Sequence, residues 1–230
     1  MMPRHLLLVL LLAGSGQGAH AARPMITDDA RLVDPGACQL ESWVQFLRDE
    51  TIGWALPACN PGGNFELTVG GALARPQGAS TEGAYLIQGK TLFKALEPGG
   101  WGAGLAAGYT TQPGQGTRDG SPYAYLPLSL SLADDRAVIH LNPGIIRRRE
   151  IGDTRLTWGV GGEFALSERA WLIAESFGQD KGSGFYQGGM RVWIIPGHVQ
   201  LDATYGSSFA ESRDDRWFSL GLRLISPRIF

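Results

Sequence analysis

The sequence predicts an all-β protein, a single antiparallel transmembrane β-barrel of about 12 strands. Three observations lead to this prediction. From Cys38 to the end of the chain, short segments alternate apolar and polar residues, which is the pattern of a strand with one apolar face. A secretion signal precedes these segments. Short and long connections alternate between them, as periplasmic turns and extracellular loops do in outer-membrane barrels.

Residues 1–21 have the features of a signal peptide. Arg4 and His5 form a basic start, residues 6–13 an apolar core, and residues 19–21 a small-x-small cleavage site. The apolar core is shorter than the ~20 residues that a membrane-spanning helix needs. We therefore expect export and a mature chain from Ala22, with an uncleaved anchor as the alternative. Residues 22–37 are predicted to be a periplasmic N-terminal segment, and residues 38–230 the barrel.

Twelve segments carry the strand pattern. It is clearest where Leu156, Trp158, Val160 and Phe164 share one face, which we expect to contact lipid. The segment 170–177 has apolar residues on both faces. A secreted lipocalin-like or sandwich protein is the alternative, and it would bury its apolar faces inward. The predicted strands are 38–48, 51–58, 64–75, 83–94, 101–111, 123–133, 136–146, 154–166, 169–178, 185–195, 198–207 and 216–225.

The connections fix the predicted orientation. If the N-terminus lies in the periplasm, all the short connections except 49–50 fall on the periplasmic side. The predicted short turns there are 59–63, 96–100, 134–135, 167–168 and 196–197, and the longer loops opposite are 76–81, 112–122, 147–153, 179–184 and 208–215.

The composition suits an outer-membrane protein. A net charge of −2 gives no nucleic-acid footprint. The mean hydropathy of −0.07 fits a barrel, whose inward polar residues dilute the lipid-facing ones. Seven Trp and six Tyr fit aromatic girdles at the membrane interfaces. We expect the cell outer membrane as the location and its lipid as the partner.

Three motifs near the N-terminus carry a family resemblance. They are the runs 23–30 (RPMITDDA), 35–41 (PGACQLE) and 54–61 (WALPACNP). The chain resembles a Gram-negative barrel family labelled a putative component of the MetA pathway of phenol degradation. The resemblance implies an outer-membrane barrel and raises the hypothesis of a channel for small or aromatic compounds. Phe230 fits the aromatic ending of many such barrels, whereas Pro227 and Arg228 depart from it, so the strand status of the last five residues stays open.

Cys38 and Cys59 are the two cysteines of the chain. In an exported protein we expect them to form a disulfide. Cys38 opens the first predicted strand and Cys59 follows the second, so both lie at the periplasmic rim of neighbouring strands. A reactive or metal-binding pair is the alternative, but the sequence has no CxxC motif or nearby histidine set.

Charged residues of both signs fall on the predicted inner face. One interpretation is a charged constriction that selects small polar or anionic solutes. The other is an interior salt-bridge network that fills and rigidifies a narrow barrel. The candidates are Glu41, Glu66, Lys90, Lys94, His140, Glu163, Arg191, Asp202 and Arg223.

Two further segments leave alternatives open. The run Arg147–Arg149, at the predicted outer rim, suits lipopolysaccharide phosphates, or is an exposed loop balanced by Glu150 and Asp153. Thr27 could cap a short helix with Asp28 and Asp29 in its first turn. The same segment could instead tuck into the periplasmic mouth as a plug. Two adjacent aspartates supply too few ligands for calcium.

The sequence predicts no enzyme, no cofactor and no metal site. His140 and Asn142 point inward and no serine is adjacent to them in the sequence, so a nucleophile–base arrangement is missing. Asp214 and Asp215 lie in the last loop, away from all the histidines. The predicted function is passive passage of small solutes, aromatic compounds among them. The alternative is a non-conducting structural or adhesion barrel.

Overall fold

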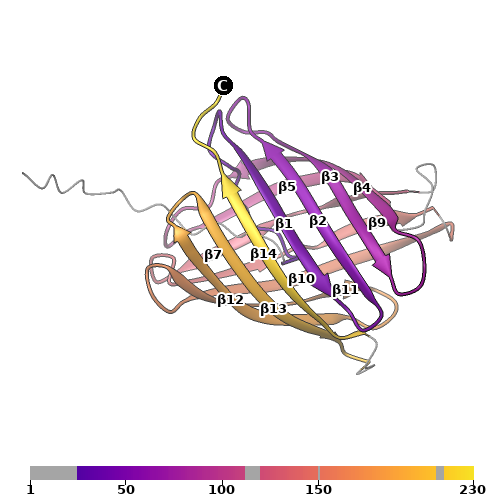
Figure 1. Ribbon diagram of the computed structural model, residues 1–230. Coiled ribbons are helices and arrows are strands. Elements are labelled where there is room, and N and C mark those ends of the chain that lie inside the picture. Colours follow the sequence, from indigo (N-terminus) through magenta and orange to yellow (C-terminus); the bar gives the residue numbers. More distant parts are fainter. Residues whose placement is uncertain (1–24, 112–119, 150, 211–214) are drawn as a thin grey trace, which may run out of the picture.

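The computed structural model describes residues 25–111, 120–149, 151–210 and 215–230, and these form a closed antiparallel barrel of 12 wall strands (Figure 1). The predicted signal peptide, most of the loop 112–122, Glu150 and Asp214 lie outside the described residues. The strand segments are β1 (Cys38–Phe46), β2 (Glu50–Cys59), β3 (Glu66–Pro76), β4 (Glu82–Lys94), β5 (Trp101–Thr110), β6 (Ser121–Tyr125), β7 (Leu128–Leu132), β8 (Ala137–Leu141), β9 (Gly144–Arg148), β10 (Asp153–Ala165), β11 (Ala170–Gln179), β12 (Phe185–Ile195), β13 (Val199–Ser208) and β14 (Trp217–Ile225).

Two of the wall strands are interrupted. The predicted strand 123–133 consists of β6 and β7, separated at Pro127, and the predicted strand 136–146 consists of β8 and β9, separated at Pro143. Proline lacks the backbone donor that a central strand needs, which explains both breaks. β5 pairs with both β6 and β7, and β10 pairs with both β8 and β9, so the wall continues across the breaks. Pairing of β1 with β14 closes the barrel.

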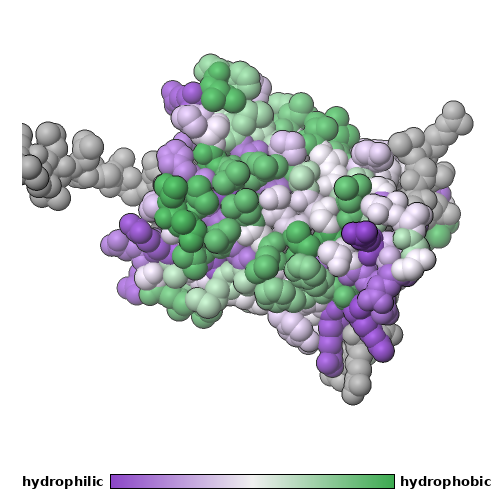
Figure 2. All heavy atoms as spheres, viewed as in Figure 1, coloured by the Kyte–Doolittle hydropathy of each residue, from purple (hydrophilic) through white to green (hydrophobic). Residues whose placement is uncertain are grey.

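The apolar face of the strands points outward. Leu156 is 61% exposed and Val160 is 46% exposed, and apolar side chains gather over the outer wall in Figure 2. In β11, Leu172 points out while Trp171 and Ile173 are buried inside, so this strand is apolar on both faces. The outward apolar face excludes the soluble alternative. No helix in the described part of the chain is long and apolar enough to cross a membrane.

The five predicted short turns lie at one end of the barrel, which we call the turn end. The other end, the loop end, carries the longer connections. Figure 1 shows the start of β1 and the end of β14 together at the turn end. The predicted disulfide is confirmed there, because Cys38 and Cys59 are directly opposite on β1 and β2 and are bonded to each other. Residues 226–230 follow β14 without strand structure, and the amide of Ile229 donates to the Gly36 carbonyl.

Candidate functional site: an inner plug and an aromatic cavity

The described residues 25–37 run inside the barrel, and we call them the plug. At the turn end the Gly36 amide donates to the Asn60 carbonyl at 2.7 Å. Further inside, the Val33 amide donates to Glu66 and the Ala30 amide to Ser129, both at 2.9 Å. The described part of the segment predicted to be periplasmic therefore lies within the barrel. The plug has no helix, so of the two predicted alternatives for Thr27 the structure has the plug.

The inner end of the plug is held by β11 and fits against glycines of β10. The Glu175 carboxylate accepts the Ile26 amide at 2.8 Å and the Thr27 amide at 2.7 Å. A Cβ atom added at Gly161 would lie 2.7 Å from the Met25 side chain. The small residue in the wall therefore makes room for the plug, while a buried carboxylate satisfies backbone donors that would otherwise be unpaired.

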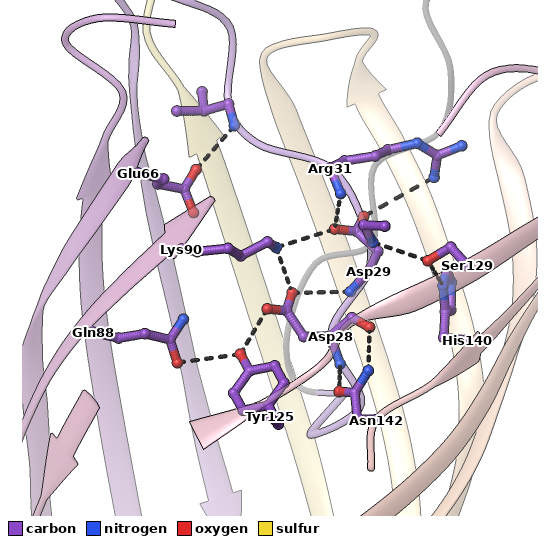
Figure 3. A network of polar contacts seen from close by, with 12 residues as sticks. Asp28, Asp29, Arg31, Glu66, Gln88, Lys90, Tyr125, Ser129, His140 and Asn142 are labelled. Carbon is purple, nitrogen blue, oxygen red and sulfur yellow. Dashed lines mark hydrogen bonds and ion pairs between the residues drawn. The ribbon is translucent and has the colours of Figure 1, made fainter. Parts of the chain in front are cut away.

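Asp28 joins the plug to several strands of the wall (Figure 3). Its carboxylate accepts from the Lys90 ammonium of β4 at 2.9 Å and from the Tyr125 hydroxyl of β6 at 2.7 Å. Its backbone exchanges two hydrogen bonds with the Asn142 side chain, at 2.5 and 2.9 Å. Lys90 also contacts Asp29 at 3.4 Å. One aspartate therefore fastens the plug to three parts of the wall.

The inner charges form a packed network. The Arg191 guanidinium contacts Glu163 and Asp202, each at 2.7 Å. His140 lies 3.1 Å from Glu163. Opposite charges are therefore in direct contact, as in the predicted salt-bridge network. Eight of the nine predicted candidates are buried on the inner side: Glu41, Glu66, Lys90, His140, Glu163, Arg191, Asp202 and Arg223.

The prediction for Lys94 is wrong. A register shift in the pairing of β4 with β5 lies between Leu92 and Lys94. Such a bulge reverses the alternation of faces, and Lys94 is exposed on the outside, with its ammonium 4.1 Å from the centre of the Trp101 ring. Sequence alternation alone cannot reveal a one-residue bulge.

The plug and the network leave little space in the turn-end half. The cavity between the plug and the walls of β1 to β4 there has a volume of about 20 Å³, which is on the order of one water molecule. Arg31 of the plug adds a contact to Asp135 at 3.5 Å. The described residues therefore do not form an open, charged constriction at this level.

The loop-end half holds a cavity of about 790 Å³. Ile26 and Thr27 of the plug contribute to its lining, and Lys181 and Asp215 line it at the loop end. Eight aromatic residues from seven strand segments also line it, of which Trp158 of β10 is exposed and the others are buried or half-buried: Trp43, Trp54, Tyr123, Tyr125, Trp158, Phe177, Phe185 and Trp217. The plug therefore separates this cavity from the packed turn-end half.

The aromatic rings of the cavity are stacked in pairs across or along strands. Trp43 and Trp54, directly opposite on β1 and β2, have ring centres 5.4 Å apart and planes 9° apart. Phe177 and Phe185, directly opposite on β11 and β12, have ring centres 5.7 Å apart. Sequence reasoning assigned aromatics to the interface girdles and missed this inner set. The available signal was the apolar inner face of residues 170–177.

The structure corrects the expectation that His140 has no serine beside it. Ser129 is directly opposite His140 on β7 and β8, with its hydroxyl 2.8 Å from Nδ1, so a serine adjacent to His140 does exist. Nε2 of His140 faces Glu163 at 3.1 Å. However, the Ser129 hydroxyl already accepts the Ala30 amide of the plug, and all three side chains are buried. The three side chains are linked in the order serine, histidine, carboxylate, as in a catalytic triad. Their burial leaves a substrate no access to the serine hydroxyl. No group of three or more potential metal ligands occurs among the described residues.

An apolar outer wall, a polar and plugged interior and 12 antiparallel strands define an outer-membrane β-barrel of porin-like architecture. The chain belongs to the family described as "Uncharacterised conserved protein UCP029691", whose model matches residues 7–225. The description of this family does not mention the MetA pathway, so the link to that pathway stays a prediction.

Solved structures share the fold. The KdgM porin matches with 8% identity and a TM-score of 0.61, covering 81% of this chain and 98% of that one. The NanC porin matches with 7% identity and a TM-score of 0.60, over 82% and 98%. The outer-membrane protein Omp33 of Acinetobacter baumannii matches with 10% identity and a TM-score of 0.54, over 81% and 96%. No curated protein matches the chain.

Proposed function

We propose that this protein is an outer-membrane transport barrel that captures small, preferably aromatic, solutes in the loop-end cavity. The turn end then faces the periplasm, and the plug blocks the route to it until the plug moves. The observation that carries the proposal is the cavity of about 790 Å³, with eight aromatic residues in its lining, directly against the plug.

The size and chemistry of the cavity support a small aromatic solute. Sites for small molecules typically have volumes of roughly 300–1,000 Å³ and mostly apolar walls with a few polar groups. Faces and edges of aromatic rings favour a further ring in stacked or tilted contact. Gln88 and Gln187 contribute polar groups to the lining, which suits a ring that carries a hydroxyl or carbonyl substituent.

The charges of the cavity argue against a polyanionic solute. One solved structure of the KdgM porin carries a disordered oligogalacturonate. Such a chain of carboxylates needs a series of cations along its path. The described lining of the cavity in this protein has two cations, Arg148 and Lys181, and one acidic residue, Asp215, and the remaining lining is uncharged.

Binding by the purified barrel tests the capture step. In isothermal titration calorimetry, 1-naphthol should bind saturably and more tightly than digalacturonate. Phe177→Ala with Phe185→Ala should weaken 1-naphthol binding by about tenfold, because an aromatic contact contributes up to about 1.5 kcal/mol. The matched control is Phe46→Ala with Phe218→Ala, a stacked pair on the outer wall. Equal losses in both variants, or no saturable binding, would contradict the proposal.

The second candidate is a non-conducting structural barrel, and the filled turn-end half favours it. Planar-bilayer recordings separate the two. A transport barrel should conduct little when the plug is seated and more in Asp28→Ala, which loses the plug's contacts to Lys90 and Tyr125. Absence of conductance in both proteins, together with absence of 1-naphthol binding and uptake, would establish the structural alternative.

A further inference from the structure

The barrel wall has a seam where the two interrupted strands meet. β6 and β7 break at residues 126–127, and β8 and β9 break at residues 142–143. Tyr125 pairs with Gly144 and Leu128 pairs with Leu141, so the two breaks face each other at the same level of the wall. We call residues 125–128 and 141–144 the proline seam.

The proline seam lacks backbone hydrogen bonds that the rest of an antiparallel ladder would have. The Leu126 amide donates to the Pro143 carbonyl at 3.0 Å, but Pro143 has no N–H to donate in return. On the other side, the Gly104 amide donates to the Pro127 carbonyl at 3.0 Å, and Pro127 likewise cannot reciprocate. Inside a membrane no water replaces such a bond, so each proline removes one hydrogen bond from the strand pairing at this level of the wall.

The aromatic cavity reaches the wall at this seam. Tyr123 and Tyr125 of β6 and Ile146 of β9 line it, and so do Ala124 and Ile145. Ala124 and Ile145 are directly opposite each other and belong to the outward face of their strands, with Ile145 45% exposed. Only the junction of the two strands therefore separates a solute at this point from the outside of the barrel.

The outer surface beside the seam is apolar. Leu126 is 41% exposed and Leu141 is 44% exposed. These side chains face the hydrocarbon of a membrane in an outer-membrane barrel. A solute that passed between the strands would therefore move from aromatic side chains to lipid without crossing the charged network of the turn-end half.

The plug holds the two sides of the seam together. Asp28 accepts the Tyr125 hydroxyl on the β6 side and bonds twice to Asn142 on the β8 side. The same residue anchors the plug to Lys90. Release of Asp28 would therefore free the plug and remove the brace across the seam in one step.

We propose that the proline seam opens sideways and lets an apolar aromatic solute pass from the cavity into the membrane, with Asp28 of the plug as its lock. This inference rests on the proposed function, because the cavity must first capture the solute. It differs in the exit route, which leads through the wall and not through the turn end.

A disulfide directly beside the seam tests the route, because it holds together the two strands that would have to separate. Ala124→Cys with Ile145→Cys joins the outward pair next to the seam. Val69→Cys with Ile87→Cys, an opposite and exposed pair on β3 and β4, is the matched control. Uptake of 1-naphthol is measured in cells that carry each variant in the outer membrane, with and without reductant. The oxidised seam variant should take up no more than cells without the protein, and reductant should restore its uptake.

Cells with the control variant should take up 1-naphthol like cells with the wild type, both with and without reductant. This control shows whether reduction of the native Cys38–Cys59 disulfide itself changes uptake. Normal uptake by the oxidised seam variant would overturn the lateral route and leave the proposed function standing. Absence of 1-naphthol binding and uptake in the wild type would instead overturn the proposed function itself.

A second variant keeps the test decisive if the engineered disulfide disturbs folding. Pro143→Thr restores the missing donor opposite Leu126 and should reduce uptake while 1-naphthol binding persists. Pro57→Thr, on the exposed face of β2, is the control and should leave uptake unchanged. Full uptake by Pro143→Thr would contradict the proposed role of the seam.

Discussion

At the scale of single residues, Asp28 ties the plug to several parts of the barrel wall. Its side chain contacts β4 and β6, and its backbone contacts Asn142 between β8 and β9. A plug without regular secondary structure has few internal hydrogen bonds, so its order depends on such anchors.

Asp28→Ala should therefore loosen the plug without unfolding the barrel. We expect faster hydrogen exchange at the amides of Ala30 and Val33, measured by mass spectrometry, because these donors would spend more time away from Ser129 and Glu66. Asp34→Ala, at an exposed position of the plug, should leave these amides protected. Unchanged protection of the Ala30 and Val33 amides in Asp28→Ala would show that Asp28 does not anchor the plug.

Arg191 is the residue on which the buried network depends. Arg191→Met would leave Glu163 and Asp202 without their shared cation, and we expect a loss of about 3–5 kcal/mol in the free energy of unfolding. Lys94→Met, which removes an exposed charge, should cost less than about 1 kcal/mol. Equilibrium unfolding in a lipid bilayer measures both. Similar values for the two variants would show that the network contributes little to stability.

At the scale of elements, the arginines of the predicted basic run 147–149, at the loop end of β9, alternate between the two sides of the wall. Arg147 and Arg149 are exposed, whereas Arg148 lines the cavity. Arg147 donates to the Thr154 hydroxyl at 3.0 Å, and the Arg149 guanidinium lies 5.8 Å from the centre of the Tyr109 ring. Asp153, one of the two acids expected to balance the run, pairs with Arg155 at 2.8 Å. This arrangement favours the predicted contact with lipopolysaccharide phosphates.

Arg147→Gln with Arg149→Gln should weaken lipopolysaccharide binding by roughly 100-fold or more, because each charge-assisted contact to a phosphate contributes about 1.5–3 kcal/mol. Arg148→Gln, on the cavity side, should leave binding unchanged. Retention of the lipid by detergent-purified protein on a sizing column measures this. Equal retention by all the variants would mean that the run is an ordinary exposed loop that does not bind lipopolysaccharide.

At the scale of the whole molecule, the barrel has two halves with different chemistry. The turn-end half is filled by charges and the plug, while the loop-end half keeps a cavity with aromatic rings in its lining. The outer wall, in contrast, is apolar. This division fits capture at the loop end and control by the plug.

The outer wall gives a direct test of insertion. Val160→Arg should destabilise the barrel by roughly 2–4 kcal/mol in lipid, because its side chain lies on the lipid face near the middle of β10. Thr157→Arg, on the cavity side of the same strand, should cost much less. Refolding titrations into bilayers measure both. Equal costs would mean that the faces of β10 are wrongly assigned.

The sequence by itself determined the fold class, the strands, the end at which each turn lies and the disulfide. Each of these follows from a local signal: alternation along a strand, the length of a connection, or two cysteines in an exported chain. It also brought Arg191, Glu163 and Asp202 to one face, because alternation fixes the side on which each residue lies.

Four features follow only from the tertiary structure. They are the position of the plug inside the barrel, the aromatic cavity, the outward direction of Lys94 and the contact between Ser129 and His140. Residues 25–37 carry no periodic pattern, so their place depends on partners such as Glu66 and Glu175 that lie far along the chain. A bulge shifts faces by one residue without a clear local signal. Closure of the barrel alone brings residues from distant strands around one space, and that is where the candidate function lies.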